Sequence, residues 1–362
     1  MIILEKALNF LSSKQYSGLF FASSVLVSFG ILTVTIGGSW DVTNHLLNRP
    51  ETFFSPPHAI LYVGVAIALA STVTKFFSWK NFPDETKSQH AKQVKLAILG
   101  IAILVGAGPF DFFWHSTFGL DGLLSPPHLF LIFGMILCST ASITSIVRYS
   151  NKKLISNSYT PFHFLIIIGL LAVLLSTSGL FYSLSLPFSD TAHFKFSPDP
   201  TFAVVFTTIA FPFLFSSILY LSSSFATYKF GIASIVGVLF LIINAATSII
   251  QNSFLTPTLG FYFLGVTPIV IFDVVLSYIS KRKLQYLAGA IPGMCFYFFY
   301  FPLITHTYNE VFSHQIVWPS MTALIYFEML ESVFPLVVVP AAIAGILGTI
   351  FASKITQKLR LI

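Results

Sequence analysis

Charged residues are scarce in this chain: Asp, Glu, Lys and Arg make up 9% of its 362 residues, and hydrophobic residues make up 55%. Soluble domains carry about a quarter charged residues, so this composition excludes a soluble protein. It predicts an all-α polytopic bundle of transmembrane helices, with the lipid bilayer as the first partner. The sequence also lacks a phosphate-binding loop, a dinucleotide fingerprint and a recognisable nucleophile motif.

Cysteine and methionine are rare as well. Cys138 and Cys295 lie in apolar stretches, which excludes a disulfide framework and a cysteine-based metal site. Five methionines are too few for a methionine-rich transport path. The net charge of +6 does not indicate a nucleic-acid partner, because Lys and Arg in a membrane chain mostly mark the orientation of its loops.

Apolar stretches of about 20 residues, long enough to cross a bilayer, occur along the whole chain. The first 150 residues form one predicted part and residues 151–362 a second, C-terminal transmembrane bundle. We predict about ten spans, at residues 17–37, 57–77, 94–114, 127–147, 162–184, 200–222, 230–250, 256–279, 284–302 and 334–352.

The basic residues predict the orientation of these spans. With both termini cytoplasmic, seventeen of the nineteen Lys and Arg residues fall on the cytoplasmic face, and only Arg49 and Lys195 fall outside. The outer face instead gathers carboxylates and imidazoles, and such a face attracts cations. It includes seven of the nine histidines: His45, His58, His115, His128, His193, His306 and His314.

One stretch of this outer face is written twice. WDVTNHLLNRPETFFSPPH, residues 40–58, is followed seventy residues later by FDFFWHSTFGLDGLLSPPH, residues 110–128. Both copies read Asp-x3-His-x12-His without a gap and end on Ser-Pro-Pro-His. The repeated residues are Asp41, His45 and His58 in the first copy and Asp111, His115 and His128 in the second.

Each copy predicts a helix, a ligand loop and a second helix. The first span is expected to end at Gly37-Gly38-Ser39; if helix continues beyond it, Asp41 and His45 share one face because they are four residues apart. Ser55 and Ser125 are expected to cap the following helices, since Pro is tolerated in a first turn. Two such units in the same orientation predict a pseudo-two-fold axis along the membrane normal.

Two imidazoles and one carboxylate per unit are a usable ligand set for a divalent transition metal ion. Copper is the first candidate, because Cu(II) stands highest in the affinity order and the ion would arrive from outside the cytoplasm. Zinc or another divalent transition metal is the alternative cofactor. The residues also allow Asp–His hydrogen bonds that tie helix ends, and they allow one shared site or two separate sites.

Two further polar groups are predicted at the outer face. His306, Glu310 and His314 recur at every fourth position, which suits either an additional site or the polar side of an interfacial helix. Asp190 and His193 precede Ser-Pro-Asp-Pro and resemble a decayed third copy of the repeat. A surface role is the alternative for both groups.

Three acids lie in or beside apolar stretches. Asp273 is well inside a predicted span, where an acid suits either a proton relay or a hydrogen bond to a neighbouring helix. Glu328 and Glu331 lie within residues 316–333, which we expect to be interfacial or re-entrant. A full span there would place the C-terminal Lys and Arg cluster outside.

The first copy carries more than its three ligand candidates. Its order is Asp41, His45, Arg49, Glu51-Thr52, Phe54, Pro56 and His58. This order resembles a copper site in the membrane-bound copper monooxygenases that oxidise methane or ammonia, which lies in one of their transmembrane subunits. The resemblance implies Asp41, His45 and His58 as copper ligands and a monooxygenase-like subunit as the enzyme class.

The second copy shares the spacing but lacks the Arg and the acid–Thr pair. It is also similar to an uncharacterised class of prokaryotic membrane proteins with D-x2-W-H-x2-F-G and S-P-x-H. The resemblance covers about 20 residues in each copy and nothing after residue 150.

Three functions follow from the sequence. The first is an integral membrane metal-binding protein, a divergent relative or accessory of that monooxygenase subunit. The second is a metal or proton-coupled transporter that uses the outer Asp and His residues for uptake and Asp273 as an inner relay. The third is a structural subunit of a larger membrane complex, with other membrane subunits as partners.

Overall fold

The computed structural model confirms the all-α membrane bundle. It describes residues 2–46, 52–119, 123–150, 161–185, 193–194, 198–251, 253–296, 299 and 334–360. These residues include no strand, and nine of their helices are long and apolar enough to cross a membrane. The helices are α1 (Ile2–Leu46), α2 (Pro56–Lys80), α3 (Asp84–Phe118), α4 (Pro126–Ser150), α5 (Pro161–Ser183), α6 (Pro200–Phe225), α7 (Ile232–Ile249), the 3-10 helix η1 (Ser253–Thr258), α8 (Leu259–Tyr278), α9 (Arg282–Leu287) and α12 (Phe334–Arg360).

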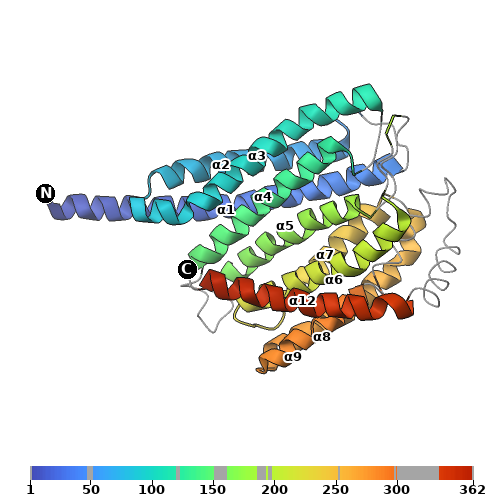
Figure 1. The fold of residues 1–362 in the computed structure, drawn as a ribbon. Helices are drawn as coiled ribbons and strands as arrows, with labels where there is room; N and C mark the ends of the chain where they lie inside the picture. Colours follow the sequence, from blue (N-terminus) through green and yellow to red (C-terminus); the bar gives the residue numbers. More distant parts are fainter. Residues whose placement is uncertain are drawn as a thin grey trace.

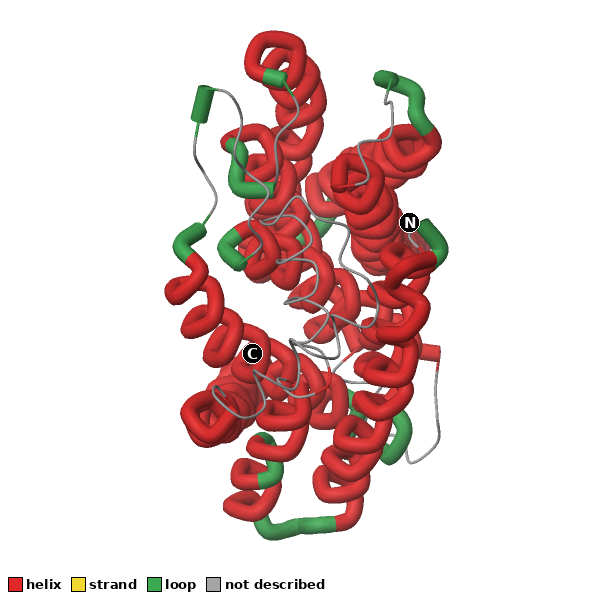
Figure 2. Tube along the Cα trace, turned by 90° about the vertical axis from the view of Figure 1, so that its right-hand side faces the viewer, coloured by secondary structure: helices red, strands yellow, loops and turns green. Residues whose placement is uncertain are grey.

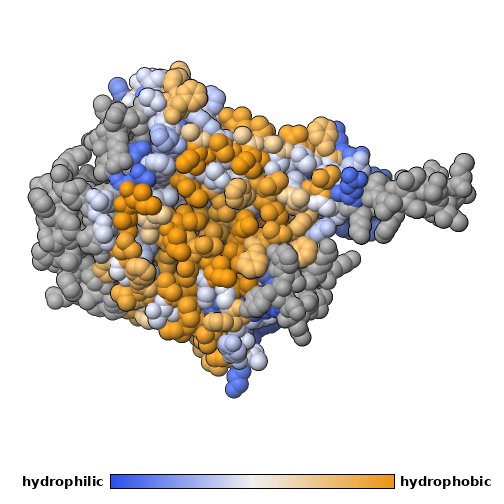
Figure 3. Space-filling model, turned by 180° about the vertical axis from the view of Figure 1, so that it is seen from behind, coloured by the Kyte–Doolittle hydropathy of each residue, from blue (hydrophilic) through white to orange (hydrophobic). Residues whose placement is uncertain are grey.

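The long helices lie side by side with their axes roughly aligned (Figure 1), and the view from the end shows them packed as a bundle (Figure 2). Both termini lie at the same end of the bundle, as the prediction of an even number of crossings requires. Seen from behind, the described side chains form a broad hydrophobic surface (Figure 3). Its large apolar residues are exposed, as expected for a surface that faces lipid.

The helix pairs α1–α2 and α3–α4 are two copies of one hairpin. A Cβ atom added at Gly64 would lie 2.7 Å from the Gly30 carbonyl oxygen, and one added at Gly134 would lie 2.9 Å from that of Gly100. Both pairs therefore cross where glycine allows the backbones to touch, as small residues do in membrane helices. The second pair lies seventy residues after the first, so the repeat extends into the helices.

The predicted pseudo-two-fold axis agrees with the packing of the four helices. Contacts of α1 with α4 are matched by contacts of α2 with α3. The buried Lys75 Nζ also donates a hydrogen bond to Ser145 Oγ at 2.9 Å, and these two residues occupy the same position in the two copies. Equivalent residues can meet in this way only close to an axis that relates them.

The first span does not end at Gly37-Gly38, so that prediction is wrong. Helix α1 is continuous from Ile2 to Leu46, about 68 Å at 1.5 Å per residue. Gly37 packs directly on α2, where a Cβ atom would lie 2.8 Å from the Leu61 nitrogen. Beyond it, Ser39 Oγ donates to Thr247 Oγ1 at 2.8 Å. Packing on both sides therefore holds the glycine pair in helical conformation.

The predicted span 284–302 is also wrong as a continuous helix. Helix α9 ends at Leu287, a turn follows at 288–289, and residues 290–296 are helical again. At Gly289 a Cβ atom would lie 2.6 Å from Thr349 Cγ2 of α12, so the chain approaches α12 closely at the break.

Residues 1–150 pack on the rest of the bundle mainly through α1 and α4. Helix α4 contributes to the same core as α5 to α8, and α1 contacts α5 and α7. Thr43 Oγ1, one turn beyond Ser39, donates to the Thr247 carbonyl at 3.2 Å. The end of α1 that carries Asp41 is thus held against α7.

Candidate metal-binding site

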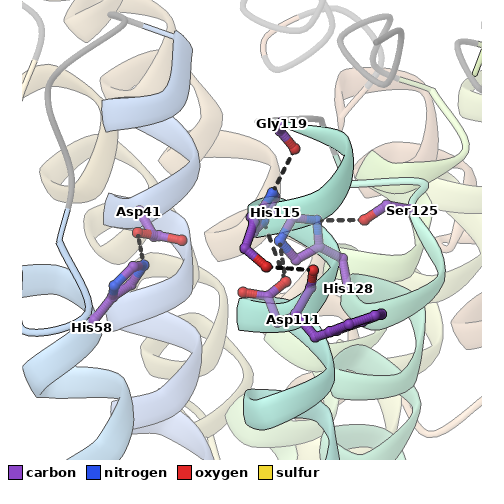
Figure 4. Close-up of polar contacts among 9 residues, drawn as sticks. Asp41, His58, Asp111, His115, Gly119, Ser125 and His128 are labelled. Atoms are coloured by element: carbon purple, nitrogen blue, oxygen red, sulfur yellow. Dashed lines mark hydrogen bonds and ion pairs between the residues drawn. The ribbon is translucent and has the colours of Figure 1, made fainter. Parts of the chain in front are cut away.

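The second unit brings its three predicted ligands together. Asp111 Oδ1 lies 3.4 Å from His115 Nε2 and 3.2 Å from His128 Nε2. One potential ligand atom from each residue falls within a set whose members are all within 4.8 Å of one another. Figure 4 shows both rings turned toward the carboxylate. We name these residues the Asp111 group.

Two helices position the Asp111 group. Asp111 and His115 lie one turn apart on α3, whereas His128 is in the first turn of α4. The group is partly buried, with side-chain exposures of 25%, 17% and 13% for Asp111, His115 and His128. It is therefore shielded from bulk solvent yet not sealed.

The other ring nitrogens of this group are occupied. His115 Nδ1 lies 3.0 Å from the Gly119 carbonyl oxygen, and His128 Nδ1 lies 3.0 Å from Ser125 Oγ. A carbonyl oxygen only accepts, so His115 donates from Nδ1, and neutral His115 presents the Nε2 lone pair to Asp111. A lone pair facing a carboxylate oxygen is stabilised by a proton or a cation near both atoms.

The Ser125 hydroxyl does not cap α4 with its side chain but contacts the His128 ring. Ser55 lies at the cap position of α2 and likewise makes no side-chain capping bond. The predicted serine caps are therefore wrong as hydrogen bonds. The second helical position in each copy is Pro57 or Pro127, and proline has no N–H for a serine to accept.

The first unit shows a closer pair. Asp41 Oδ1 lies 2.8 Å from His58 Nε2, and His58 Nδ1 donates to the Thr52 carbonyl at 3.0 Å. His45 lies in α1 one turn beyond Asp41, but its side chain is outside the described residues. The described part of this unit thus has the Asp–His contact that a helix tie requires, with the same ring orientation as in the second unit.

The two units lie side by side at the same end of the bundle (Figure 4). Each contact described above joins residues within one unit. Between the units lies the ring of Phe53, whose centroid is 5.0 Å from that of Tyr62 on α2 and 5.7 Å from that of Phe112 on α3. The sites are thus adjacent and separated by aromatic side chains.

Asp273 forms an N-terminal cap for α7. One of its carboxylate oxygens, Oδ2, accepts from the Gly231 N–H at 2.9 Å, the Ser234 N–H at 2.9 Å and the Ser234 hydroxyl at 2.7 Å. A carboxylate at a helix N-terminus satisfies backbone donors and complements the helix dipole. This geometry supports the predicted hydrogen bond to a neighbouring helix over the proton relay.

The remaining candidates are described only in part. His193 is exposed, and its ring centroid lies 5.9 Å from that of Phe118. The predicted residues Asp190, His306, Glu310, His314, Glu328 and Glu331 lie outside the described residues.

Sequence reasoning missed four neighbours of the two sites. The Gly119 and Thr52 carbonyls, which orient histidines, leave no sequence signal because any residue supplies a carbonyl. Phe53 and Tyr62 also went unnoticed, although Tyr62 follows His58 by four residues and so shares its helix face.

Comparison with known proteins adds no relative: no protein-family model, curated protein or solved structure matches this chain. The resemblance to the copper monooxygenases therefore stays a prediction that the motif alone carries.

Proposed function

We propose that this membrane protein binds a divalent transition metal ion through Asp111, His115 and His128. The observation that carries the proposal is the convergence of two Nε2 atoms on one carboxylate while both Nδ1 atoms contact neighbours. Metal-ligating histidines typically use the second ring nitrogen in this way, which fixes the ring orientation. Three protein ligands also leave a coordination position for water or another small ligand.

Copper is the ion we propose first. Imidazole and carboxylate ligands accept several divalent ions, and Cu(II) binds most tightly in the general order. Zinc is the main alternative, because two histidines and one carboxylate are also a common zinc set.

The family resemblance supports the same chemistry from a different unit. The fuller motif belongs to the first copy, whereas the three-residue group belongs to the second. We therefore propose a divergent relative or accessory of the copper monooxygenases, in which the second unit binds the metal ion. A transporter would need a further polar station within the membrane, and Asp273 instead caps α7.

Metal analysis of the purified full chain tests this proposal. After incubation with Cu(II) or Zn(II) and removal of excess ion, we expect at least one ion per chain by mass spectrometry of the metal. Copper should displace zinc in direct competition, because it stands higher in the affinity order. A chain that retains neither ion would refute the proposed function.

We further propose that the Asp111 group faces the extracytoplasmic side, with both termini cytoplasmic. The expected result is that a cysteine introduced at Arg49 reacts with a membrane-impermeant maleimide in intact cells, whereas one at Lys87 reacts only after lysis. Arg49 follows α1 and Lys87 lies near the start of α3, at opposite ends of the spans. A background that lacks Cys138 and Cys295 removes other labelling. Equal labelling of both positions would contradict the topology.

A further inference from the structure

Tyr62 is where the two units differ beside their sites. It follows His58 by four residues on α2, and the equivalent position seventy residues later is the buried Ile132 of α4. Its ring centroid lies 6.2 Å from that of His58. The first unit therefore offers a phenol where the second packs an aliphatic side chain.

Tyr62 is oriented toward the second unit as well. The Phe53 ring contacts both Tyr62 and Phe112, and Phe112 is the residue after Asp111 on α3. The charges of Asp111 and Asp41 both act on the Tyr62 hydroxyl, and that of Asp111 has the larger effect. The phenol thus lies between the two carboxylates although α2 carries only one histidine ligand candidate.

We propose that the Tyr62 hydroxyl donates a hydrogen bond to the small anion or water that completes the coordination of the metal ion at the Asp111 group. This inference rests on the proposed function. A phenol is a neutral donor at physiological pH, and its hydrogen bond to an anionic ligand is charge-assisted. It would select small ligands with an anionic oxygen or nitrogen atom and would not itself hold the metal ion.

The test compares the full-length wild-type protein with Tyr62→Phe, which removes the hydroxyl and keeps the ring beside Phe53. Both are loaded with Cu(II) and titrated with azide, a small anionic probe whose binding changes the visible absorption spectrum. We expect equal copper content and an azide dissociation constant about tenfold higher in the variant. Tyr220→Phe is the matched control, because its hydroxyl contacts Tyr228 on the far side of the bundle.

The outcomes separate the two proposals. If Tyr62→Phe binds copper and azide as the wild type does, the inference is wrong and the metal site stands. If Tyr62→Phe loses copper while its melting temperature is unchanged, Tyr62 holds the metal ion and the inference is also wrong. If wild-type protein binds no metal ion, the proposed function fails and the inference fails with it.

Discussion

His128→Ala is expected to lower the metal affinity of the Asp111 group by at least about 100-fold. His128 is the one member of the group on α4, so its loss leaves two ligands, both on α3. Removing a group that only orients a ligand already costs about 10–100-fold in affinity, and removing a ligand costs more. Competition with a chelator of known affinity, together with metal content, measures the loss.

Three further variants make this result specific. Ser125→Ala removes the partner of His128 Nδ1 and should lower affinity by about 10-fold or more while keeping the stoichiometry. His193→Ala is the matched control, because it removes an exposed imidazole near the end of α3 without touching a ligand. His58→Ala reports whether the first unit contributes, and combined with His128→Ala it tests both units. Unchanged affinity in His128→Ala would exclude the Asp111 group as the site.

Gly64→Val is expected to destabilise the protein by about 3 kcal/mol or to prevent its folding. A Cβ atom at Gly64 would lie 2.6 Å from the Val34 nitrogen and 2.7 Å from the Gly30 carbonyl oxygen, both in α1. Backbone atoms cannot move aside without separating α1 from α2. Since α1 carries Asp41 and α2 carries His58, the variant should also separate that pair. The yield of monodisperse protein and its melting temperature in detergent measure the effect.

Gly106→Ala is the control for this substitution. Gly106 lies in α3, and nothing is within 4 Å of the position that its Cβ atom would take. Because alanine favours helix over glycine, we expect no destabilisation and a gain of up to about 1 kcal/mol. Equal melting temperatures for Gly64→Val and Gly106→Ala would show that the close crossing of α1 and α2 does not support the fold.

The class of protein and the members of the Asp111 group could be predicted from the sequence because both depend on local rules. Low charge and long apolar stretches predict membrane helices. The spacing of four residues places Asp111 and His115 on one face of a helix, and Ser-Pro-Pro-His places His128 in a first turn. The gap-free repeat also indicated that the second unit copies the first.

Only the tertiary structure decided which of these residues meet and how their rings are turned. His128 reaches Asp111 because α3 and α4 cross closely at Gly100 and Gly134, a contact between residues far apart in sequence. The Gly119 carbonyl orients the His115 ring through a backbone atom, which carries no residue-specific signal. Asp273 was placed within a span by its sequence, yet the packing of α8 on α7 makes it a helix cap. Such roles arise from long-range packing, which spacing along one helix does not encode.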